Sequence, residues 1–175
     1  MKGDLDTDTI RNFSSILSPL LSGLALFFTR KFWLMANRPI ISVNVETESS
    51  GNINTMYNLV VYNSGNRPAI NIQLKVKEDD LEQIFCERND ANKKYFDYHI
   101  ESIKRCFNQK TMIPLILNGK SISNSFGLTG QNGILIYKSQ LPIKITYQDL
   151  DGRKYSNNQK LLITTSEVFA DGQWT

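Results

Sequence analysis

The sequence contains very few of the residues that build catalytic and metal sites. Among its 175 residues there is one histidine, His99, and there are two cysteines, Cys86 and Cys106, which are 20 positions apart. A zinc site would need both cysteines and two further ligands, and no C-x-x-C pair is present. A nucleophile with a histidine base could use only His99, which we expect to be an ordinary helical side chain. The sequence therefore predicts neither an enzyme nor a bound metal or cofactor.

Other motifs that carry chemistry are incomplete. The stretch GLTGQNG lacks the Lys-Ser/Thr pair of a P-loop and the strand–helix context of a dinucleotide site. Asp149 and Asp151 precede Gly152 as in a calcium loop, but the further ligands are missing, so a hairpin turn explains them better. Cys86 and Cys106 could form a disulfide in an oxidising compartment and would stay thiols in a reducing one. Their redox state is therefore a test of which side of a membrane the domain faces.

Strong charge of either sign is also absent. There are 20 Lys and Arg residues against 17 Asp and Glu residues, which gives a net charge of +3 at pH 7. This balance is too mild to make nucleic acid the expected partner. Hydrophobic residues form 41% and charged residues 21% of the chain, a composition that excludes a disordered tail protein and a multi-span membrane protein. We expect one globular domain with an appended element.

Charge is missing altogether from one stretch near the N-terminus. After a polar tail at residues 1–9, no residue between Arg11 and Arg30 is charged, which leaves an uncharged run of 18 positions. A helix needs roughly 17–25 mostly apolar residues to cross a bilayer. The leucines of this run also recur at helical spacing. We therefore predict a membrane-associated helix at residues 10–36 that crosses the bilayer once.

Two features of the predicted helix are typical of membrane proteins. Small residues, which allow close packing between membrane helices, are found at Ser15, Ser18, Ser22 and Gly23. An aromatic and cationic collar, as found at membrane–water interfaces, is formed by Arg30, Lys31, Phe32 and Trp33. Arg30, Lys31 and Arg38 on the C-terminal side of the uncharged run slightly outnumber Lys2 and Arg11 on the other side. This bias predicts a single-pass protein of the inner membrane whose C-terminal domain is cytoplasmic.

There are two other interpretations of the helix, a secretory signal peptide and a helix that packs on protein. A secretory signal peptide fits poorly, because Asp4, Asp6 and Asp8 precede the apolar run and no A-x-A cleavage site follows it. The second alternative is an amphipathic or buried helix that packs on its own domain or on a partner protein. The sequence does not decide between that helix and a membrane span.

From residue 37 onward the hydrophobic period changes from that of a helix to that of a strand. Apolar and polar residues alternate along several short segments, as in strands with one buried face. The clearest segments are 41–46, 57–62, 70–77, 112–117, 122–126 and 143–147. Turn sequences rich in Asn, Gly and Asp separate them, and a loop with Gly127, Gly130 and Gly133 precedes a further strand at 134–137. Residues 37–166 are therefore predicted to form an antiparallel β-sandwich, followed by a polar tail at 167–175.

A helical insert interrupts the strands at about residues 79–110. Phe96, Ile100, Ile103 and Phe107 recur there at helical spacing and predict a buried helix face. The polar side of the insert carries a basic patch that could bind a partner or lipid headgroups; it consists of Lys93, Lys94, Lys104 and Arg105. Aromatic residues between these cations would also permit base stacking. Acidic residues dilute the patch, however, so nucleic acid is disfavoured as the partner.

The order of these features resembles a known fold. The segments VVYNSGNRPAINIQLKV, IPLILNGKSI and IKITYQDLDGRKY are similar to the core strands and turns of immunoglobulin-like β-sandwiches in small single-span bacterial membrane proteins. The resemblance covers about residues 40–165, and the helical insert departs from the usual seven-strand plan. It implies a mainly β, immunoglobulin-like antiparallel β-sandwich with a helical insert, preceded by one N-terminal transmembrane helix.

The predicted function follows from this organisation rather than from a site. We expect a non-enzymatic, membrane-tethered module that recognises a protein or ligand near the membrane and that assembles as a homo- or hetero-oligomer. The alternative is a membrane-disrupting toxic effector of a bacterial anti-phage defence system, triggered through the β-sandwich. Both functions depend on the N-terminal helix and the sandwich acting together.

Overall fold

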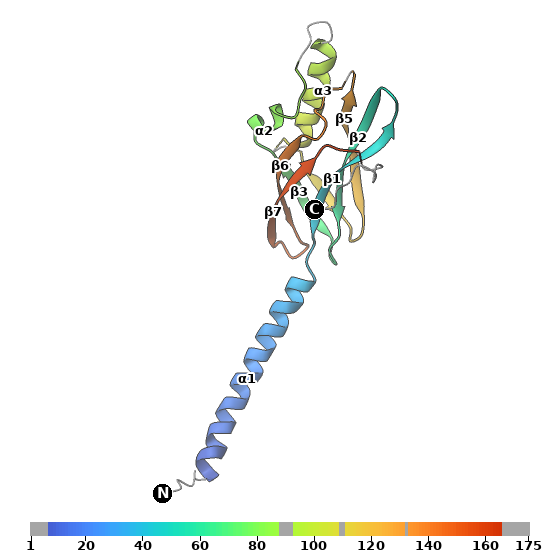
Figure 1. The fold of residues 1–175 in the computed structure, drawn as a ribbon. Helices are drawn as coiled ribbons and strands as arrows, with labels where there is room; N and C mark the ends of the chain where they lie inside the picture. The colour runs from blue at the N-terminus through green and yellow to red at the C-terminus, as the bar shows by residue number, and fades with distance from the viewer. Residues whose placement is uncertain (1–6, 88–92, 109–110, 132, 166–175) are drawn as a thin grey trace. The chain divides into compact units, whose positions relative to one another are not determined.

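The computed structural model describes residues 7–87, 93–108, 111–131 and 133–165 (Figure 1). Most of both predicted terminal tails lies outside the described residues. The chain divides into two units, Met1–Arg38 and Pro39–Thr175. We call them the helix unit and the β unit. Apart from the first helix, the described chain is mainly β, with two antiparallel sheets and two further helices.

The helix unit consists of α1, which spans Thr7–Ala36. The helix stops where the chain approaches Pro39, since the residue before a proline disfavours the helical conformation. Asn37 closes the last turn, because its backbone N–H and its side-chain amide both donate to the carbonyl of Trp33 at 2.9 Å. Within the described residues, α1 and the other helices do not reach the combination of length and apolarity that a membrane span requires.

Seven strands make up the two sheets of the β unit. They are β1 (Ile41–Ser50), β2 (Asn54–Asn63), β3 (Ala69–Lys75), β4 (Ile113–Ile116), β5 (Ser121–Gly130), β6 (Gln140–Gln148) and β7 (Lys154–Leu162). One sheet has the order β1-β2-β5 and the other the order β4-β3-β6-β7, with every neighbouring pair antiparallel. The predicted alternation of apolar and polar residues is confirmed most clearly in β6, where Leu141, Ile143, Ile145 and Tyr147 are buried.

The two sheets share one hydrophobic core. Residues of β1, β2 and β5 belong to the same buried cluster as residues of β3, β6 and β7. A side chain also joins the sheets at one edge, because the amide of Gln159 in β7 accepts the backbone N–H of Val43 at 3.0 Å and donates to the Val43 carbonyl. This amide pairs with the β1 backbone as a neighbouring strand would, so it holds β1 beside β7.

The predicted helical insert is confirmed as α2 (Glu78–Glu82) and α3 (Lys93–Cys106). Phe96, Ile100, Ile103 and Phe107 are buried in the common core, as their spacing predicted. The Phe107 ring meets Phe126 of β5 edge-on, with ring centroids 6.0 Å apart. Figure 1 shows both helices beside one end of the sheets. The insert therefore covers one end of the core instead of forming a separate domain.

Two predictions at and after β5 differ from the structure. Gly127 and Gly130 lie inside β5 instead of in a loop. Gly127 has φ +137° at an irregularity in the pairing of β2 with β5, and Leu135, Ile134 and Ile103 fill the space beside it. Residues 134–137 make only an isolated bridge, Phe85 to Leu135, in place of the expected strand. The missing side chain at position 127 thus allows the apolar segment after β5 to pack onto the core.

Candidate functional site

The described surface of α1 is largely apolar. Ile16 and Leu26 are 71% and 72% exposed. Ten further large apolar side chains of the helix are also exposed: Phe13, Leu17, Leu20, Leu21, Leu24, Phe27, Phe28, Phe32, Trp33 and Met35. At about 100° per residue, these positions extend well beyond one side of the helix. An apolar surface of this extent marks an interaction site rather than an ordinary water-facing helix.

A stripe of small residues runs along one flank of α1. It consists of Ser15, Ser18, Ser22, Ala25 and Thr29, all exposed and spaced three or four residues apart. The Ser22 hydroxyl donates to the Ser18 carbonyl at 2.9 Å, and the Thr29 hydroxyl donates to the Ala25 carbonyl at 2.8 Å. Ala25 and Thr29 were not among the predicted packing residues, although they continue the same spacing. Gly23 directly follows Ser22 and is turned about 100° from it, so it lies off the stripe.

The predicted collar residues follow one another in the last turns of α1. Arg30, Lys31, Phe32 and Trp33 are all exposed. Phe28 stacks on Phe32 with ring centroids 6.3 Å apart and meets Phe27 edge-on at 5.7 Å. The end of the helix therefore carries aromatic rings and cations side by side, the combination that is enriched at membrane interfaces.

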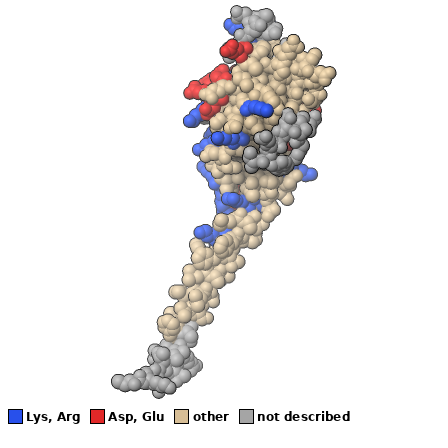
Figure 2. All heavy atoms as spheres, in the orientation of Figure 1, with Lys and Arg blue, Asp and Glu red and all other residues tan. Residues whose placement is uncertain are grey.

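The predicted basic patch on the insert is divided in the structure. Lys104 bonds to Glu82 at 2.6 Å and to Glu78 at 3.3 Å, so it joins α3 to α2. The hydrogen bond to Glu82 is the main reason that the pKa of Lys104 is raised. Arg105 lies 3.8 Å from Glu101, and Figure 2 shows acidic residues gathered where α2 lies. Lys93 and Lys94, at the other end of α3, take part in none of the ion pairs among the described residues. The predicted basic surface is therefore limited to these two lysines.

The residues considered for catalysis and metal binding are not brought together. His99 is half-buried and its ring lies 4.3 Å from that of Tyr95. Cys86 and Cys106 are both free and half-buried, and burial raises the pKa of each thiol. In the part of the chain that the structure describes, no three His, Cys, Asp or Glu side chains are grouped as metal ligands.

An apolar cavity of about 300 Å³ opens between the sheets, on the side of β4 and β5. Its walls include core residues of both sheets and the Cys106 thiol. Asn124 pairs with Leu59, and Ile122 pairs with Val61. Because directly paired residues share a sheet face, Asn124 and Ile122 also point inward. The cavity exists because β4 is only four residues long and leaves this part of β5 uncovered.

Two buried polar side chains organise the loops at one end of the β unit. The Asn63 amide donates to the carbonyls of Arg67 and Ile116 at 2.8 and 3.1 Å. Its oxygen accepts the N–H groups of Gly65 and Ile40 at 3.1 and 3.3 Å. Asn63 thereby fixes the start of β1, the β2–β3 turn and the end of β4. The Asn- and Gly-rich sequence between the strands predicts a turn here but not this role of Asn63.

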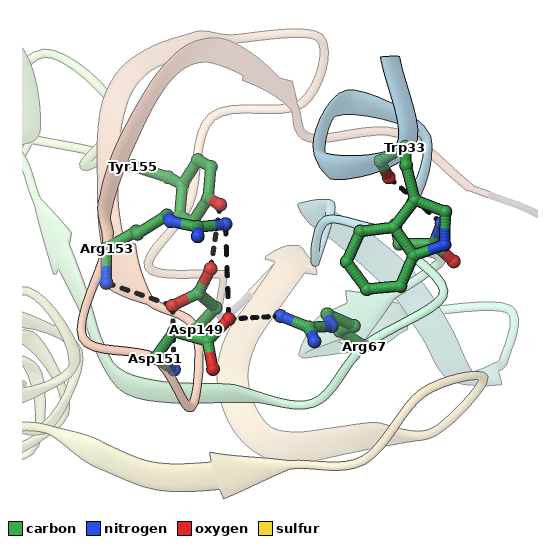
Figure 3. A network of polar contacts seen from close by, with 7 residues as sticks. Trp33, Arg67, Asp149, Asp151, Arg153 and Tyr155 are labelled. Atoms are coloured by element: carbon green, nitrogen blue, oxygen red, sulfur yellow. Dashed lines mark hydrogen bonds and ion pairs between the residues drawn. The ribbon is translucent and has the colours of Figure 1, made fainter. Parts of the chain in front are cut away.

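The second buried polar residue is Asp149, in the turn between β6 and β7 (Figure 3). It is 0% exposed. One carboxylate oxygen accepts the N–H groups of Asp151 and Arg153, both at 2.9 Å, and the other accepts the Tyr155 hydroxyl at 2.9 Å. The neighbouring Asp151 carboxylate forms an ion pair with Arg67 and lies 3.9 Å from Arg153. These contacts shape a hairpin turn, as predicted.

A comparison with protein families matches most of the chain. The model of a domain of unknown function, DUF8453, matches residues 11–166. The matched range begins inside α1 and ends after β7, so it includes both the helix unit and the β unit. No curated protein matches the chain.

Proposed function

We propose that this chain, which belongs to the DUF8453 family, is a non-enzymatic recognition module held at a membrane by α1. The observation that carries the proposal is the exposed apolar surface of the helix, from Phe13 to Met35. Burying one large apolar side chain contributes roughly 1.5–3 kcal/mol. Twelve such side chains strongly favour removal of the helix from water. In this proposal, the uncharged run from Asn12 to Thr29 lies in the hydrocarbon, although the described part of α1 does not by itself reach the apolarity of a membrane span.

A membrane explains α1 better than a protein groove does. A groove would cover one face, whereas the exposed apolar residues of α1 extend around much of the helix. The uncharged run is followed directly by the collar Arg30–Trp33, which suits the headgroup region. The Ser22 and Thr29 hydroxyls donate to carbonyls of their own helix, so they would not be left without acceptors in lipid.

The β unit would supply the recognition surface, and we infer that it is an immunoglobulin-like sandwich. In constant immunoglobulin domains the sheets contain strands ABED and CFG. The order here, β1-β2-β5 and β4-β3-β6-β7, corresponds to that plan with the fourth strand moved to the second sheet. Such sandwiches commonly bind partners through their loops and sheet faces. Anchoring would raise the local concentration of the β unit for partners near the membrane.

Vesicle flotation of the full chain tests the anchor. The chain is refolded from detergent into neutral phosphatidylcholine vesicles, which are then floated through a density gradient in high salt and in carbonate. We expect the chain to stay with the vesicles under both conditions, because apolar burial does not depend on ionic strength. A chain that remains soluble and monodisperse after detergent removal, and does not float, contradicts the proposal.

The small-residue stripe favours a second candidate function, a membrane-disrupting effector in which several α1 helices associate. Small residues let membrane helices approach closely, and the stripe from Ser15 to Thr29 runs along one flank. If the chain arrests growth on expression, we expect Ser18→Leu to abolish the arrest and the cross-linked oligomer. Gly23→Leu, off the stripe, is the matched control and should keep both. Equal effects of the two substitutions would exclude packing through the stripe.

A further inference from the structure

The outer face of β3, β6 and β7 is mainly polar. The residues that pair across these strands form rows, and none of these rows contains an acidic residue. The register places Lys75 opposite Lys144 and Lys144 opposite Asn158. The next rows are Gln73, Thr146 and Ser156, then Ile70, Gln148 and Lys154. The alternate residues of β6 point into the core, so these side chains face away from it.

Five lysines gather on and around this face, and we call them the lysine face: Lys75, Lys77, Lys144, Lys154 and Lys160. They line two adjoining shallow grooves, one of which Asp80 also lines. Among the residues that the structure describes, the ion pairs present involve none of the five lysines. Figure 2 shows cations along one edge of the β unit, beginning beside the acidic group at α2.

The pairing of Lys75 with Lys144 works against the stability of the sheet. Directly opposite residues have Cβ atoms about 5 Å apart, and like charges there are destabilising. An external anion would remove this repulsion. The amides of Gln148 and Asn158 lie beside the lysines in the register and could donate hydrogen bonds to the same anion.

The chemistry of the face favours a diffuse anionic surface over a nucleic acid. All five cations are lysines, which act as mobile point charges, whereas arginines would offer bidentate contacts to individual phosphates. The face also lacks an exposed aromatic ring in its paired rows: Tyr147 is buried, and Tyr155 is half-buried with its hydroxyl bonded to Asp149. Single-stranded nucleic acids are held largely by stacking on such rings.

We propose that the lysine face binds the anionic phospholipid headgroups of the membrane that holds α1. This inference rests on the proposed function, since the anchor would keep the headgroups close to the β unit. It assigns the lipid contact to the sheet, in place of the predicted patch at Lys93, Lys94, Lys104 and Arg105. This contact would also orient the β unit at the membrane surface.

Lysine footprinting tests this contact in the full chain. The protein is placed in nanodiscs of phosphatidylcholine alone or mixed with phosphatidylglycerol, and mass spectrometry measures the acetylation rate of each lysine. In anionic discs we expect the five lysines to react at least about fivefold more slowly, the change expected for each lysine near an anionic surface. High salt should restore the rates. Lys93 and Lys94 are internal controls whose rates should not change.

The results of the footprinting distinguish the proposed lipid contact of the lysine face from the proposed membrane anchor α1. Equal rates in both kinds of disc, with the chain still in the discs, overturn the lipid contact and leave the anchor intact. A chain that enters neither kind of disc contradicts the anchor. Equal protection of Lys93 and Lys94 also overturns the inference. So does protection of the five lysines by a single-stranded oligonucleotide in neutral discs, which would identify a nucleic-acid surface.

A pair of variants shows whether the lysines act together. Lys75→Gln with Lys144→Gln should remove the protection of Lys154 and Lys160. The thermal unfolding temperature should stay the same or rise, because the substitution removes a like-charge pair. Loss of lipid contact without loss of stability is a result that a purely structural role would not give. Lys93→Gln with Lys94→Gln makes the same charge change on α3 and should keep the protection.

Discussion

Replacing Leu20 and Leu24 by lysine is expected to release the full chain from neutral phospholipid vesicles. The two leucines are one helical turn apart and are 61% and 47% exposed. A lysine near the centre of a membrane helix costs about 3 kcal/mol. Two of them cost about 6 kcal/mol together, which corresponds to a roughly 10⁴-fold weaker partition. Flotation of the wild-type chain and the variant measures this change.

The control places the same charges on the β unit. Ile53 and Leu150 are 61% and 64% exposed, and Ile53→Lys with Leu150→Lys should float as the wild type does. If the Leu20 and Leu24 variant also floats undiminished, α1 does not lie in hydrocarbon, and its apolar surface must be covered by protein instead. Release of both double variants would show a general effect of added charge.

Replacing Asp149 by alanine is expected to destabilise the β unit by about 3 kcal/mol. The change removes the acceptor of three hydrogen bonds, from Asp151, Arg153 and Tyr155. Each lost bond of this kind costs about 1 kcal/mol or more, because its donor is left without a partner. Chemical unfolding of the full chain in detergent, followed by the β-sheet circular-dichroism signal, measures the free energy of unfolding.

The stabilisation of the β unit by the Asp149 carboxylate should also depend on pH. Burial alone would raise the pKa of this carboxyl, but the hydrogen bonds from Arg153, Tyr155 and Asp151 outweigh it and lower the pKa. The unfolded chain then takes up the proton first as the pH falls through about 4. The stabilisation is therefore complete above this range and is lost as the pH falls toward the lowered pKa. Alanine at position 149 should remove this component of acid sensitivity.

Asp151 provides the matched control for this turn. Its carboxylate is largely solvated and forms ion pairs with arginine side chains, and exposed pairs contribute less than about 1 kcal/mol. Asp151→Ala should therefore change stability only slightly. An Asp149→Ala variant within about 1 kcal/mol of the wild type, or one whose deficit is the same at neutral and acid pH, would contradict this account of the turn.

Local patterns predicted those features that depend on near neighbours in the chain. Helical spacing identified the α3 residues that face the core, and two-residue alternation identified most strands. The alternation was misleading in β3, where the pairing is irregular between Ile70 and Gln73 and Asn71 has φ +54°. Ile72 and Leu74 are buried, but Ile70 is only half-buried. A bulge changes the side-chain alternation, and nothing in the local sequence marked it.

Charge was the property that the sequence predicted least well. Lys104 and Arg105 were predicted to form a basic patch because they are near Lys93 and Lys94 along the helix. The structure instead pairs Lys104 with Glu78 and Glu82 of α2. The lysine face was not predicted, because its members come from β3, the segment after it, β6 and β7. Asp149 was predicted to lie in a hairpin turn, and its partners are in or directly after that same turn. Asn63 also bonds to Ile40 and Ile116, which lie far from it in the chain.

The sequence by itself determined that α1 is apolar and free of charge over one long run, and that the following chain alternates as strands do. Both properties depend on side chains a few positions apart, and the periods of the helix and the strand translate them directly into surfaces. Only the tertiary structure decided which lysines share a face, which segments Asn63 joins, that Arg67 pairs with Asp151, and where a cavity stays open between the sheets. These features depend on strand order, register and strand length, which bring together residues that are far apart in the chain.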